Sequence, residues 1–517
     1  MNILLLNPPS KDTSWYRAEH LGLAYLAASL RQVGHRVKIL DAFLENFDVD
    51  KTIKAILSLE DTINILGITA TEPQTLFSGI RIVNKLQQNG INPHVTAGGY
   101  LPTFWSEEVL IKFPEIDSLV LGEGEQTITE LVDALQKGRE LRDIPGLALQ
   151  DEQGHVFHTE KRSLIANLDA LPFPARDYLS VAYQKYHHAL VYSSRGCYHK
   201  CSFCQIAQFY RLSTGSPYRS RSVKNIADEI EILVKKHGVR SVFFVDDEFI
   251  TESSKRIKII EELIHEIDKR QLKFNFSIQY RADTGTREEL LKKLKSIGLN
   301  TVFVGVESGV DSVLERFDKG IDKADIQTAL QLIEDFSFNK NIGYILFNPG
   351  TTYNELRESI TYLLTPKAPT LIKLIGMMVL KGTPENNTLK AENSSLKRDF
   401  SIRYPIKDKK VAAFASMVKR YYPIYEPVAK DYYELHFLIG DLSENESQQI
   451  LKRVKVVEKN IRNLHQLFLS RALEELDQDQ AINNNNWVDE LRNPFIPLHV
   501  QTQQILQDGI RLIEADK

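Results

Sequence analysis

Short apolar runs alternate with amphipathic segments over the first 150 residues. The segment 21–34 repeats apolar residues at helical spacing and stops at Gly34, which predicts a helix. Further helices are expected near 76–90 and from Gln126 onward, and strands at 3–7, 36–42, 64–69, 94–99 and 118–125. Strands separated by single helices predict a parallel, doubly wound α/β sheet. Ligands of such sheets bind at the carboxyl ends of the strands.

The same alternation resumes at about residue 188 and continues for six strand–helix units. The strands are expected at 189–194, 241–247, 274–280, 300–307, 341–348 and 370–379. One of the intervening helices is expected over 222–238, with apolar residues on one face and an end at Gly238. This pattern predicts a partial parallel βα barrel, whose active residues would lie at the carboxyl ends of its strands.

Beyond about Gly382, long helical stretches replace the alternation. Helices are expected over 408–480 and near 498–514, with a polar hinge at 482–487 between them. We therefore divide the chain into a sheet domain at 1–150, a connector at 151–187, a barrel at 188–380, and a helical region at 381–517 that is a candidate substrate cap. Tyrosines are concentrated in this last region, and we expect most of them to pack in its core and one or two to face the site: Tyr404, Tyr421, Tyr422, Tyr425, Tyr432 and Tyr433.

Composition and charge narrow the range of partners. Apolar residues make up 43% of the chain and charged residues 26%, as in soluble globular proteins. The 64 basic and 68 acidic residues give a net charge of −4, which favours neither nucleic acid nor an anionic membrane. No apolar run reaches the roughly 18 residues that cross a bilayer, and the first ten residues lack the basic start of a secretory signal. We expect a cytoplasmic protein with no membrane span and no nucleic-acid partner.

All three cysteines of the chain, Cys197, Cys201 and Cys204, fall in one C-x3-C-x2-C loop after the first barrel strand. An odd number of cysteines in a long cytoplasmic chain gives no disulfide framework, so a shared metal remains. A [4Fe–4S] cluster needs four ligands, and three cysteines would leave one iron open to a substrate. The alternative is a structural zinc site completed by His199, although such sites normally use two separated ligand pairs.

The motif C-x3-C-x-aromatic-C, with Phe203 before the last cysteine, resembles that of the radical S-adenosylmethionine (SAM) superfamily. The resemblance implies a [4Fe–4S] cluster whose free iron chelates the methionine part of SAM, and a 5′-deoxyadenosyl radical released after one-electron cleavage. It also implies an electron donor such as a flavodoxin or ferredoxin. Further strand ends match the superfamily where SAM contacts are expected: Asp246, Asp247, Glu248, Gln279, Arg281 and Glu307. The segment 341–352 resembles the one whose backbone receives adenine, although Phe347-Asn348 departs from the usual glycine-rich form.

A second resemblance covers residues 1–180. NPPS, the helix at 21–34, AGGYLPT at 97–103 and LGEGE at 121–125 resemble the Rossmann-like cobalamin-binding domain that precedes the barrel in one large radical-SAM subgroup, and YRSRSVKNIADEIE at 218–231 matches that subgroup as well. The resemblance implies cobalamin at the strand ends, near Thr69, Thr71, Glu72, Gly98, Gly99, Gly122 and Gly124.

The chain lacks the Asp-x-His-x-x-Gly motif whose histidine coordinates cobalt in other cobalamin domains. His20 and His35 do not have its flanking residues. We therefore expect cobalamin to bind with no histidine on cobalt.

Together the resemblances imply a radical-SAM enzyme that uses cobalamin to functionalise an unactivated carbon of a small molecule or peptide, with C-methylation as the leading expectation. The alternatives are an epimerase, cyclase or rearrangement enzyme with a vestigial cobalamin domain, or a non-catalytic cobalamin- or zinc-binding protein. An epimerase usually needs a hydrogen-atom donor such as a further cysteine, and the chain has none.

Overall fold

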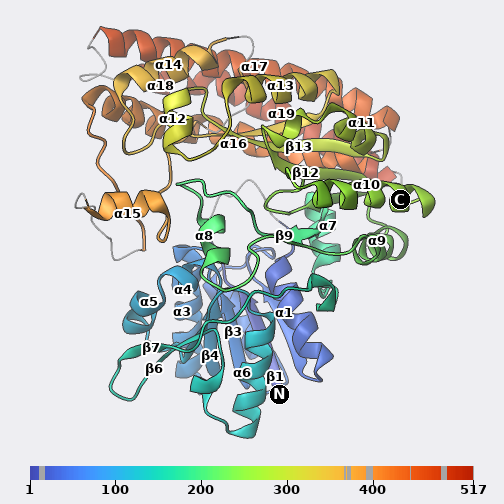
Figure 1. The fold of residues 1–517 in the computed structure, drawn as a ribbon, viewed down its shortest axis with the longest axis vertical. Helices are drawn as coiled ribbons and strands as arrows, with labels where there is room; N and C mark the ends of the chain where they lie inside the picture. Colours follow the sequence, from blue (N-terminus) through green and yellow to red (C-terminus); the bar gives the residue numbers. More distant parts are fainter. Residues whose placement is uncertain are drawn as a thin grey trace.

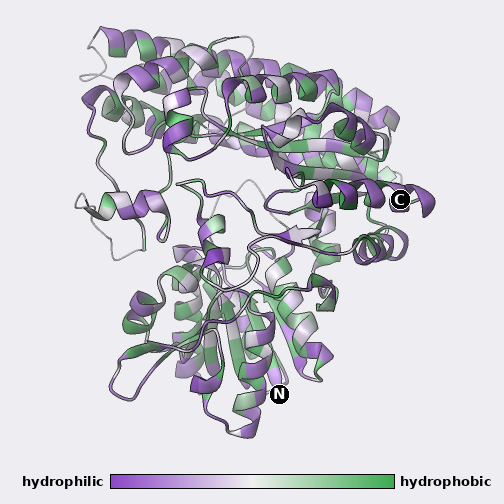
Figure 2. Ribbon diagram, viewed as in Figure 1, coloured by the Kyte–Doolittle hydropathy of each residue, from purple (hydrophilic) through white to green (hydrophobic). Residues whose placement is uncertain are grey.

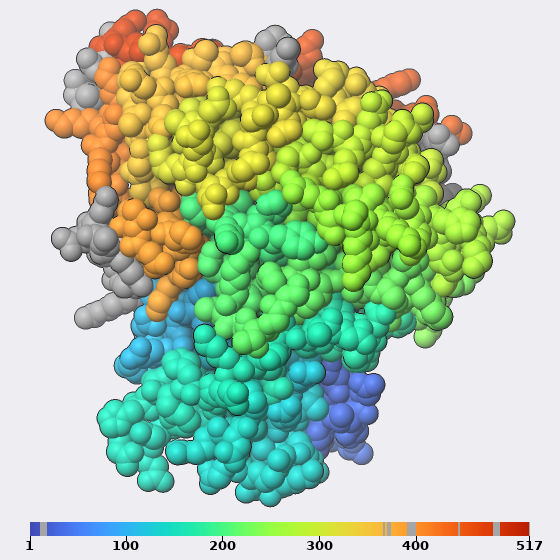
Figure 3. Space-filling view, in the orientation of Figure 1, coloured from blue at the N-terminus to red at the C-terminus, as the bar shows by residue number. Residues whose placement is uncertain are grey.

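The computed structural model describes residues 1–10, 18–365, 368–369, 374–391, 400–442, 444–478 and 486–515. They form a doubly wound sheet domain, a second parallel sheet and a set of long C-terminal helices (Figure 1). The surface view shows the sheet domain at one end, the C-terminal helices at the other and the middle of the chain between them (Figure 3). The predicted fold class is confirmed. No helix in the described ranges is long and apolar enough to cross a bilayer.

The N-terminal sheet has seven strands in the order β2-β1-β3-β4-β5-β6-β7, of which the first five are parallel. The strands are β1 (Asn2–Asn7), β2 (Arg36–Asp41), β3 (Ile65–Thr69), β4 (His94–Gly98), β5 (Ser118–Val120), β6 (Leu147–Gln150) and β7 (Val156–His158). The helices are α1 (Leu21–Gln32), α2 (Val49–Leu57), α3 (Pro73–Gln88), α4 (Tyr100–Phe104), α5 (Ser106–Lys112) and α6 (Glu125–Lys137). The sheet runs on to β7, past the boundary predicted at residue 150.

Strand β1 shows why helices cover both faces of this sheet. Side chains alternate along a strand, and here both sets are apolar. Leu4 and Leu6 belong to the core under α2, α3 and α5, whereas Ile3 and Leu5 belong to the core under α1 and α6. Figure 2 shows the green, hydrophobic strands enclosed between these helices.

The second sheet has five parallel strands in the order β14-β13-β12-β11-β8. The elements of this region are α7 (Leu179–Tyr186), β8 (Ala189–Val191), β9 (Ser194–Arg195), α8 (Gln205–Arg211), β10 (Arg219–Ser220), α9 (Val223–Glu231), β11 (Ser241–Phe244), α10 (Ser254–Lys269), β12 (Asn275–Arg281), α11 (Glu288–Ser296), β13 (Leu299–Glu307), α12 (Asp311–Arg316), α13 (Lys323–Asp335), β14 (Asn339–Tyr344) and α14 (Tyr353–Leu363). The helix predicted over 222–238 is α9 followed by a π-helical turn at Ile232–Lys236.

The sixth barrel strand, predicted at 370–379, is not observed. Residues 370–373 lie outside the described ranges, and 374–379 have no regular secondary structure. Two backbone bonds nevertheless follow the line of a sixth strand: Leu346 N–H donates to Ile375 C=O (3.1 Å), and Met377 N–H donates to Phe347 C=O (2.8 Å). The sheet edge is therefore covered by an extended segment too sparsely bonded to form a ladder.

The C-terminal helices pack against the second sheet. They are α15 (Pro384–Ala391), α16 (Lys409–Asp441), α17 (Glu444–Asp477), α18 (Trp487–Glu490) and α19 (Arg492–Ala515). Phe437 of α16 lies against Phe243 and Phe303 of the sheet, with ring centroids 5.8 and 6.3 Å away. Leu21 and Tyr25 of α1 join the same cluster, so all three regions share one core. Most of the predicted hinge at 482–487 lies outside the described residues.

The C-terminal tyrosines mainly pack, as predicted. Tyr421, Tyr425 and Tyr432 are buried, and Tyr421 stacks on Phe468 at 4.0 Å. Tyr404 donates a hydrogen bond to the carbonyl of Met377, Tyr433 lies against Phe303 and Phe437, and Tyr422 lies against Tyr425.

Candidate functional site

The cysteine loop leaves β9 and runs into α8. Gly196 has a φ of 88°, and a Cβ atom there would stand 1.6 Å from the carbonyl oxygen of Pro217, so only glycine fits. Backbone bonds fix the loop further: Ser202 N–H donates to Phe317 C=O (2.8 Å), and Glu385 N–H donates to Ser202 C=O (3.2 Å). The positions of the three thiols are thus set by the backbone.

The three thiols are largely shielded from water. Cys201 is buried, and Cys197 and Cys204 are half-buried. Burial raises the pKa of Cys197, and the Glu248 carboxylate, 3.5 Å from its sulfur, raises it further. Burial also raises the pKa of Cys204, although two backbone N–H groups at the start of α8 oppose this. Arg281 donates to the Cys201 sulfur at 3.6 Å. Neutral thiols in such a site become thiolates when a metal binds, because the metal is bound in place of the proton.

Cys197, His199 and Glu248 bring three donor atoms within 4.8 Å of one another, and no other trio in the described ranges does so. A single ion could use these three atoms, as in the zinc site that the sequence left as an alternative. Cys204 nevertheless raises the pKa of Cys197, and Cys201 that of Cys204, so the three sulfurs influence one another across the loop. This donor set fits a cluster spanning the loop.

The three acidic residues after β11 have different surroundings. Asp246 is fully buried and accepts hydrogen bonds from Ser193 N–H (2.7 Å), Ser194 Oγ (2.6 Å) and Arg256 Nη2 (3.0 Å). It braces the strand end and is not brought to the site. Asp247 accepts from Gly196 N–H at 2.8 Å, and burial raises its pKa to about 6. Glu248 faces the cysteine loop.

Gln279 and Arg281 extend the support around the loop. The Gln279 amide donates to the carbonyl of Asp246 at 2.6 Å, so it holds the loop after β11. Arg281 pairs with Asp283 at 3.0 Å and reaches Cys201. Of these two predicted residues, only Arg281 therefore touches a cysteine.

Glu307 ends β13 in a strained conformation. Its φ is 67°, which costs a non-glycine residue on the order of 1–3 kcal/mol, and the pairing of β13 with β14 shifts register just before it. Its carboxylate lies beside Gly305 and Gly343, where Cβ atoms would stand 2.7 and 3.4 Å from its oxygens, and pairs with Lys319 at 3.2 Å. A half-buried carboxylate held in this way suits a ligand with hydroxyl or ammonium donors.

A cavity of about 290 Å³ lies at the carboxyl end of the N-terminal sheet. Six of the seven residues predicted for cobalamin line it: Thr69, Thr71, Gly98, Gly99, Gly122 and Gly124. Gly99 and Gly122 have φ values of 117° and 71°, so any side chain there would be strained as well as intrusive. This bare floor, on which a flat ring system can approach the backbone, fits cobalamin.

The seventh predicted residue, Glu72, does not reach the cavity. It forms a capping box with Thr75 at the start of α3 and accepts a hydrogen bond from Ser10 at 2.7 Å. Its carboxylate therefore satisfies the helix end.

His20, which the residue patterns did not select, lines the cavity. Its Nδ1 accepts from Leu23 N–H (3.1 Å), so Nε2 carries the proton and faces Thr69 Oγ1 (3.1 Å). Burial lowers its pKa to about 4, which keeps the ring neutral. Both ring nitrogens of His20 are therefore engaged within the protein.

A buried ion-pair network joins this cavity to the cysteine loop. Arg195, two residues before Cys197, pairs with Glu123 (3.1 Å) and Glu125 (2.6 Å) of the LGEGE motif. Arg219 also pairs with Glu123 at 2.7 Å. Burial alone would raise the pKa of Glu123, but Arg195 and Arg219 outweigh it and hold that pKa below its usual value.

Aromatic side chains also line the cavity, and two of them, Phe209 and Tyr210, belong to α8, the helix that follows the cysteine loop. The ring of Tyr100 lies 4.7 Å from that of Phe209, and Tyr25, Tyr192 and Tyr210 also line the cavity. None of these residues was selected from the sequence. Glu123 and Glu125 could have been predicted, because they belong to the LGEGE motif whose glycines, Gly122 and Gly124, were predicted to contact cobalamin.

Comparison with known proteins agrees with this arrangement. Residues 191–363 match the family described as the radical SAM superfamily, and residues 12–132 match the B12 binding domain. An uncharacterized methyltransferase of Pyrococcus horikoshii is 32% identical over 369 residues, covering 70% of this chain and 77% of that protein. The anaerobic magnesium-protoporphyrin IX monomethyl ester cyclase of Rubrivivax gelatinosus is 30% identical over 351 residues, covering 65% of this chain and 60% of that protein.

Among solved structures, the cobalamin-dependent S-adenosylmethionine radical enzyme OxsB, with aqua-cobalamin and S-adenosylmethionine bound, is similar in fold. The TM-score is 0.75 at 19% sequence identity, covering all of this chain and 80% of that one.

Proposed function

Because the chain belongs to the radical SAM superfamily and carries a B12 binding domain before its barrel, we propose that this cobalamin-dependent enzyme is a C-methyltransferase acting on an unactivated carbon. The observation that carries the proposal is the pairing of two neighbouring sites. A glycine-floored cavity lies at the end of the N-terminal sheet, and Arg195, which lines it, lies two residues before the first cysteine of the three-cysteine loop. The relative that is 32% identical is named a methyltransferase.

The proposed division of residues follows from their contacts. Cys197, Cys201 and Cys204 would hold the cluster, and Glu248 and Glu307 would contact SAM. The cavity floor would hold cobalamin. When bound, these groups supply a carbon-centred radical and a transferable methyl group.

The chain's own residues contribute shielding and position. Tyr100, Tyr192, Phe209 and Tyr210 line the cavity with aromatic surface, which would exclude water from the space that the substrate would share with the cofactors. Arg281, close to Cys201, offsets negative charge on the sulfurs. The substrate is a small molecule or peptide. The electron donor is a reduced flavodoxin or ferredoxin.

Methyl transfer and ring formation can be separated without knowing the substrate. We expect anaerobic protein loaded with reduced cobalamin and CD3-labelled SAM to place the label on the corrinoid and to release S-adenosylhomocysteine, as measured by mass spectrometry. Formation of 5′-deoxyadenosine with no label on the corrinoid would instead favour a cyclase or rearrangement enzyme, the activity named for the Rubrivivax relative.

The SAM contacts have a separate test. Glu307→Gln should weaken SAM binding by roughly tenfold to a hundredfold, because a charge-assisted hydrogen bond contributes about 1.5–3 kcal/mol. Glu315→Gln, which makes the same change elsewhere, is the control. Equilibrium dialysis with cluster-loaded protein measures both. Equal SAM affinities for Glu307→Gln and the wild type would show that Glu307 does not contact SAM.

A further inference from the structure

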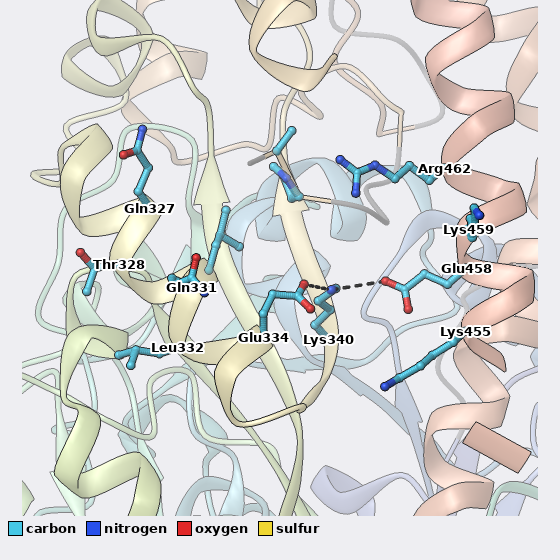
Figure 4. A pocket seen from close by; sticks show the side chains of 13 residues that line it. Gln327, Thr328, Gln331, Leu332, Glu334, Lys340, Lys455, Glu458, Lys459 and Arg462 are labelled. Carbon is cyan, nitrogen blue, oxygen red and sulfur yellow. Dashed lines mark hydrogen bonds and ion pairs between the residues drawn. The ribbon is translucent and has the colours of Figure 1, made fainter. Parts of the chain in front are cut away.

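A second cavity, of about 790 Å³, lies between α13 and α17 (Figure 4). Its floor includes Lys340 on β14, which pairs with Val302 in the sheet register, whereas Glu307 pairs with Tyr344 at the other end of the same strands. The cavity therefore opens at the opposite end of the sheet from the SAM site. Its volume is in the range of small-molecule pockets.

One wall of this cavity is cationic. Lys455, Lys459 and Arg462 occupy positions i, i+4 and i+7 of α17, which places them along one face of the helix. No hydrogen bond or ion pair engages Lys455 or Lys459 within the described ranges. Like charges four residues apart, such as Lys455 and Lys459, disfavour a helix, so helix stability does not explain this pair.

The other lining residues that the structure describes do not neutralise that wall. Gln327, Thr328 and Gln331 of α13 line the opposite side with uncharged polar side chains, of which the Thr328 hydroxyl donates to the Ala324 carbonyl and the Gln331 amide nitrogen to Asp335 (Figure 4). The two acidic residues present, Glu334 and Glu458, both pair with the buried Lys340, the latter at 3.3 Å. The cavity is left with an excess of positive charge on one wall and hydrogen-bonding side chains on the other. Leu330, Leu332, Ala368 and Pro369 add apolar surface.

We propose that this cavity binds an organic diphosphate, with the phosphates on the α17 wall and the body of the molecule on the α13 wall. Seven residues of helix rise by roughly 10 Å, so the cationic row is longer than one phosphate and matches a ligand with two or more anionic groups. The Gln327 amide supplies donors and an acceptor for hydroxyl groups or a heterocycle, and Gln331, whose amide nitrogen donates to Asp335, adds an acceptor oxygen. The site is separate from the radical chemistry and does not depend on it.

Isothermal titration calorimetry with ADP, pyrophosphate and adenosine tests the site in the full-length protein. We expect ADP to bind with a Kd below about 1 mM, pyrophosphate to bind more weakly, and adenosine not to bind detectably. Lys455→Ala/Lys459→Ala should weaken ADP binding by about tenfold or more, and raised salt should weaken it in the wild type. Gln331→Ala should weaken ADP but not pyrophosphate.

The matched control removes two charges elsewhere. Lys419→Ala/Lys452→Ala changes exposed lysines of α16 and α17 that do not line the cavity, and it should leave ADP binding unchanged. Equal weakening by both double variants would show a general charge effect and overturn the proposal. So would the absence of ADP binding, or binding of poly-glutamate without ADP, which would point to an acidic protein surface instead.

Discussion

The two sites of this enzyme are built in opposite ways. The cavity of the N-terminal sheet is defined by missing side chains, with glycines at the ends of β4 and β5 and a neutral histidine beside them. The mouth of the second sheet is crowded with charged side chains that hold one another, such as Glu307 with Lys319 and Arg281 with Asp283. A large flat cofactor needs open backbone, whereas a cluster and a zwitterionic ligand need fixed charge. The difference predicts that a substitution in one site leaves cofactor binding at the other unchanged. Arg195, which connects the two sites, is the exception.

The largest effect is expected from Cys201→Ala. It should abolish iron binding and 5′-deoxyadenosine formation, because the remaining two thiols cannot hold the cluster. Cobalamin affinity, measured by equilibrium dialysis, should stay within about twofold, since the cavity floor is unchanged. Loss of both cofactors together would contradict the separation of the two sites.

The network between the sites should be the next most sensitive point. Arg195→Gln leaves Glu123 and Glu125 without their shared cation, and breaking a buried pair costs about 3–5 kcal/mol. We expect a large fall in the midpoint of thermal unfolding. Adding Glu125→Gln should restore part of it, because Glu125 pairs with Arg195, whereas Glu123 must stay charged to pair with Arg219. Lys224→Ala, which breaks an exposed ion pair with Asp228, should cost less than about 1 kcal/mol. Similar losses in both variants would mean that the network is not a stabilising link.

Substitutions of Gly98 should affect the cavity and leave the cluster site unchanged, with a smaller effect than the changes above. Its backbone is not in the left-handed region, and a Cβ atom would come no nearer than 3.4 Å to its neighbours, so Gly98→Ala should be tolerated. Gly98→Leu should fill cavity space and weaken cobalamin binding by roughly tenfold to a hundredfold, with SAM cleavage intact. Unchanged cobalamin affinity in the leucine variant would place cobalamin elsewhere.

The effect that is smallest at neutral pH, and that grows only as the pH falls, concerns the neutral histidine of the cavity. The pKa of His20 in the folded protein, about 4, is below its usual value of about 6.5, so the unfolded chain binds a proton first as pH falls. Its contribution to stability is complete above pH 6.5 and declines by about 1.4 kcal/mol per pH unit down to about pH 4. His20→Asn, which keeps a helix-capping side chain, should flatten the dependence of unfolding on pH. The exposed His155→Asn is the control. Equal slopes in His20→Asn and the wild type would contradict the buried, neutral state.

The sequence predicted the sheets well because their strands are continuous apolar runs. The glycines lining the cavity were also within reach, since glycine at a strand end marks backbone exposure. The bracing role of Asp246 could not be predicted, because its partners Ser193 and Arg256 come from segments whose approach depends on the folded barrel. The same applies to Arg195, whose role appears only when the LGEGE segment packs against it.

Predictions failed where local pattern and tertiary context disagreed. The apolar run at 370–379 has strand composition, yet its described residues, 374–379, have no regular secondary structure and pair with the neighbouring segment 346–347 through two backbone bonds. Glu72 follows a strand end, as a ligand contact would, but the N-terminus of α3 uses it as a cap. Capping and ligand binding call for the same residue types, so sequence alone did not separate them.

The central claim is that one chain holds both a cluster and cobalamin. Elemental and cofactor analysis of anaerobically reconstituted protein tests it most directly. The account predicts about four irons and four sulfides with one cobalamin per chain. Stoichiometric zinc without iron, lost on His199→Ala, would contradict it and assign Cys197, His199 and Glu248 to a single zinc ion.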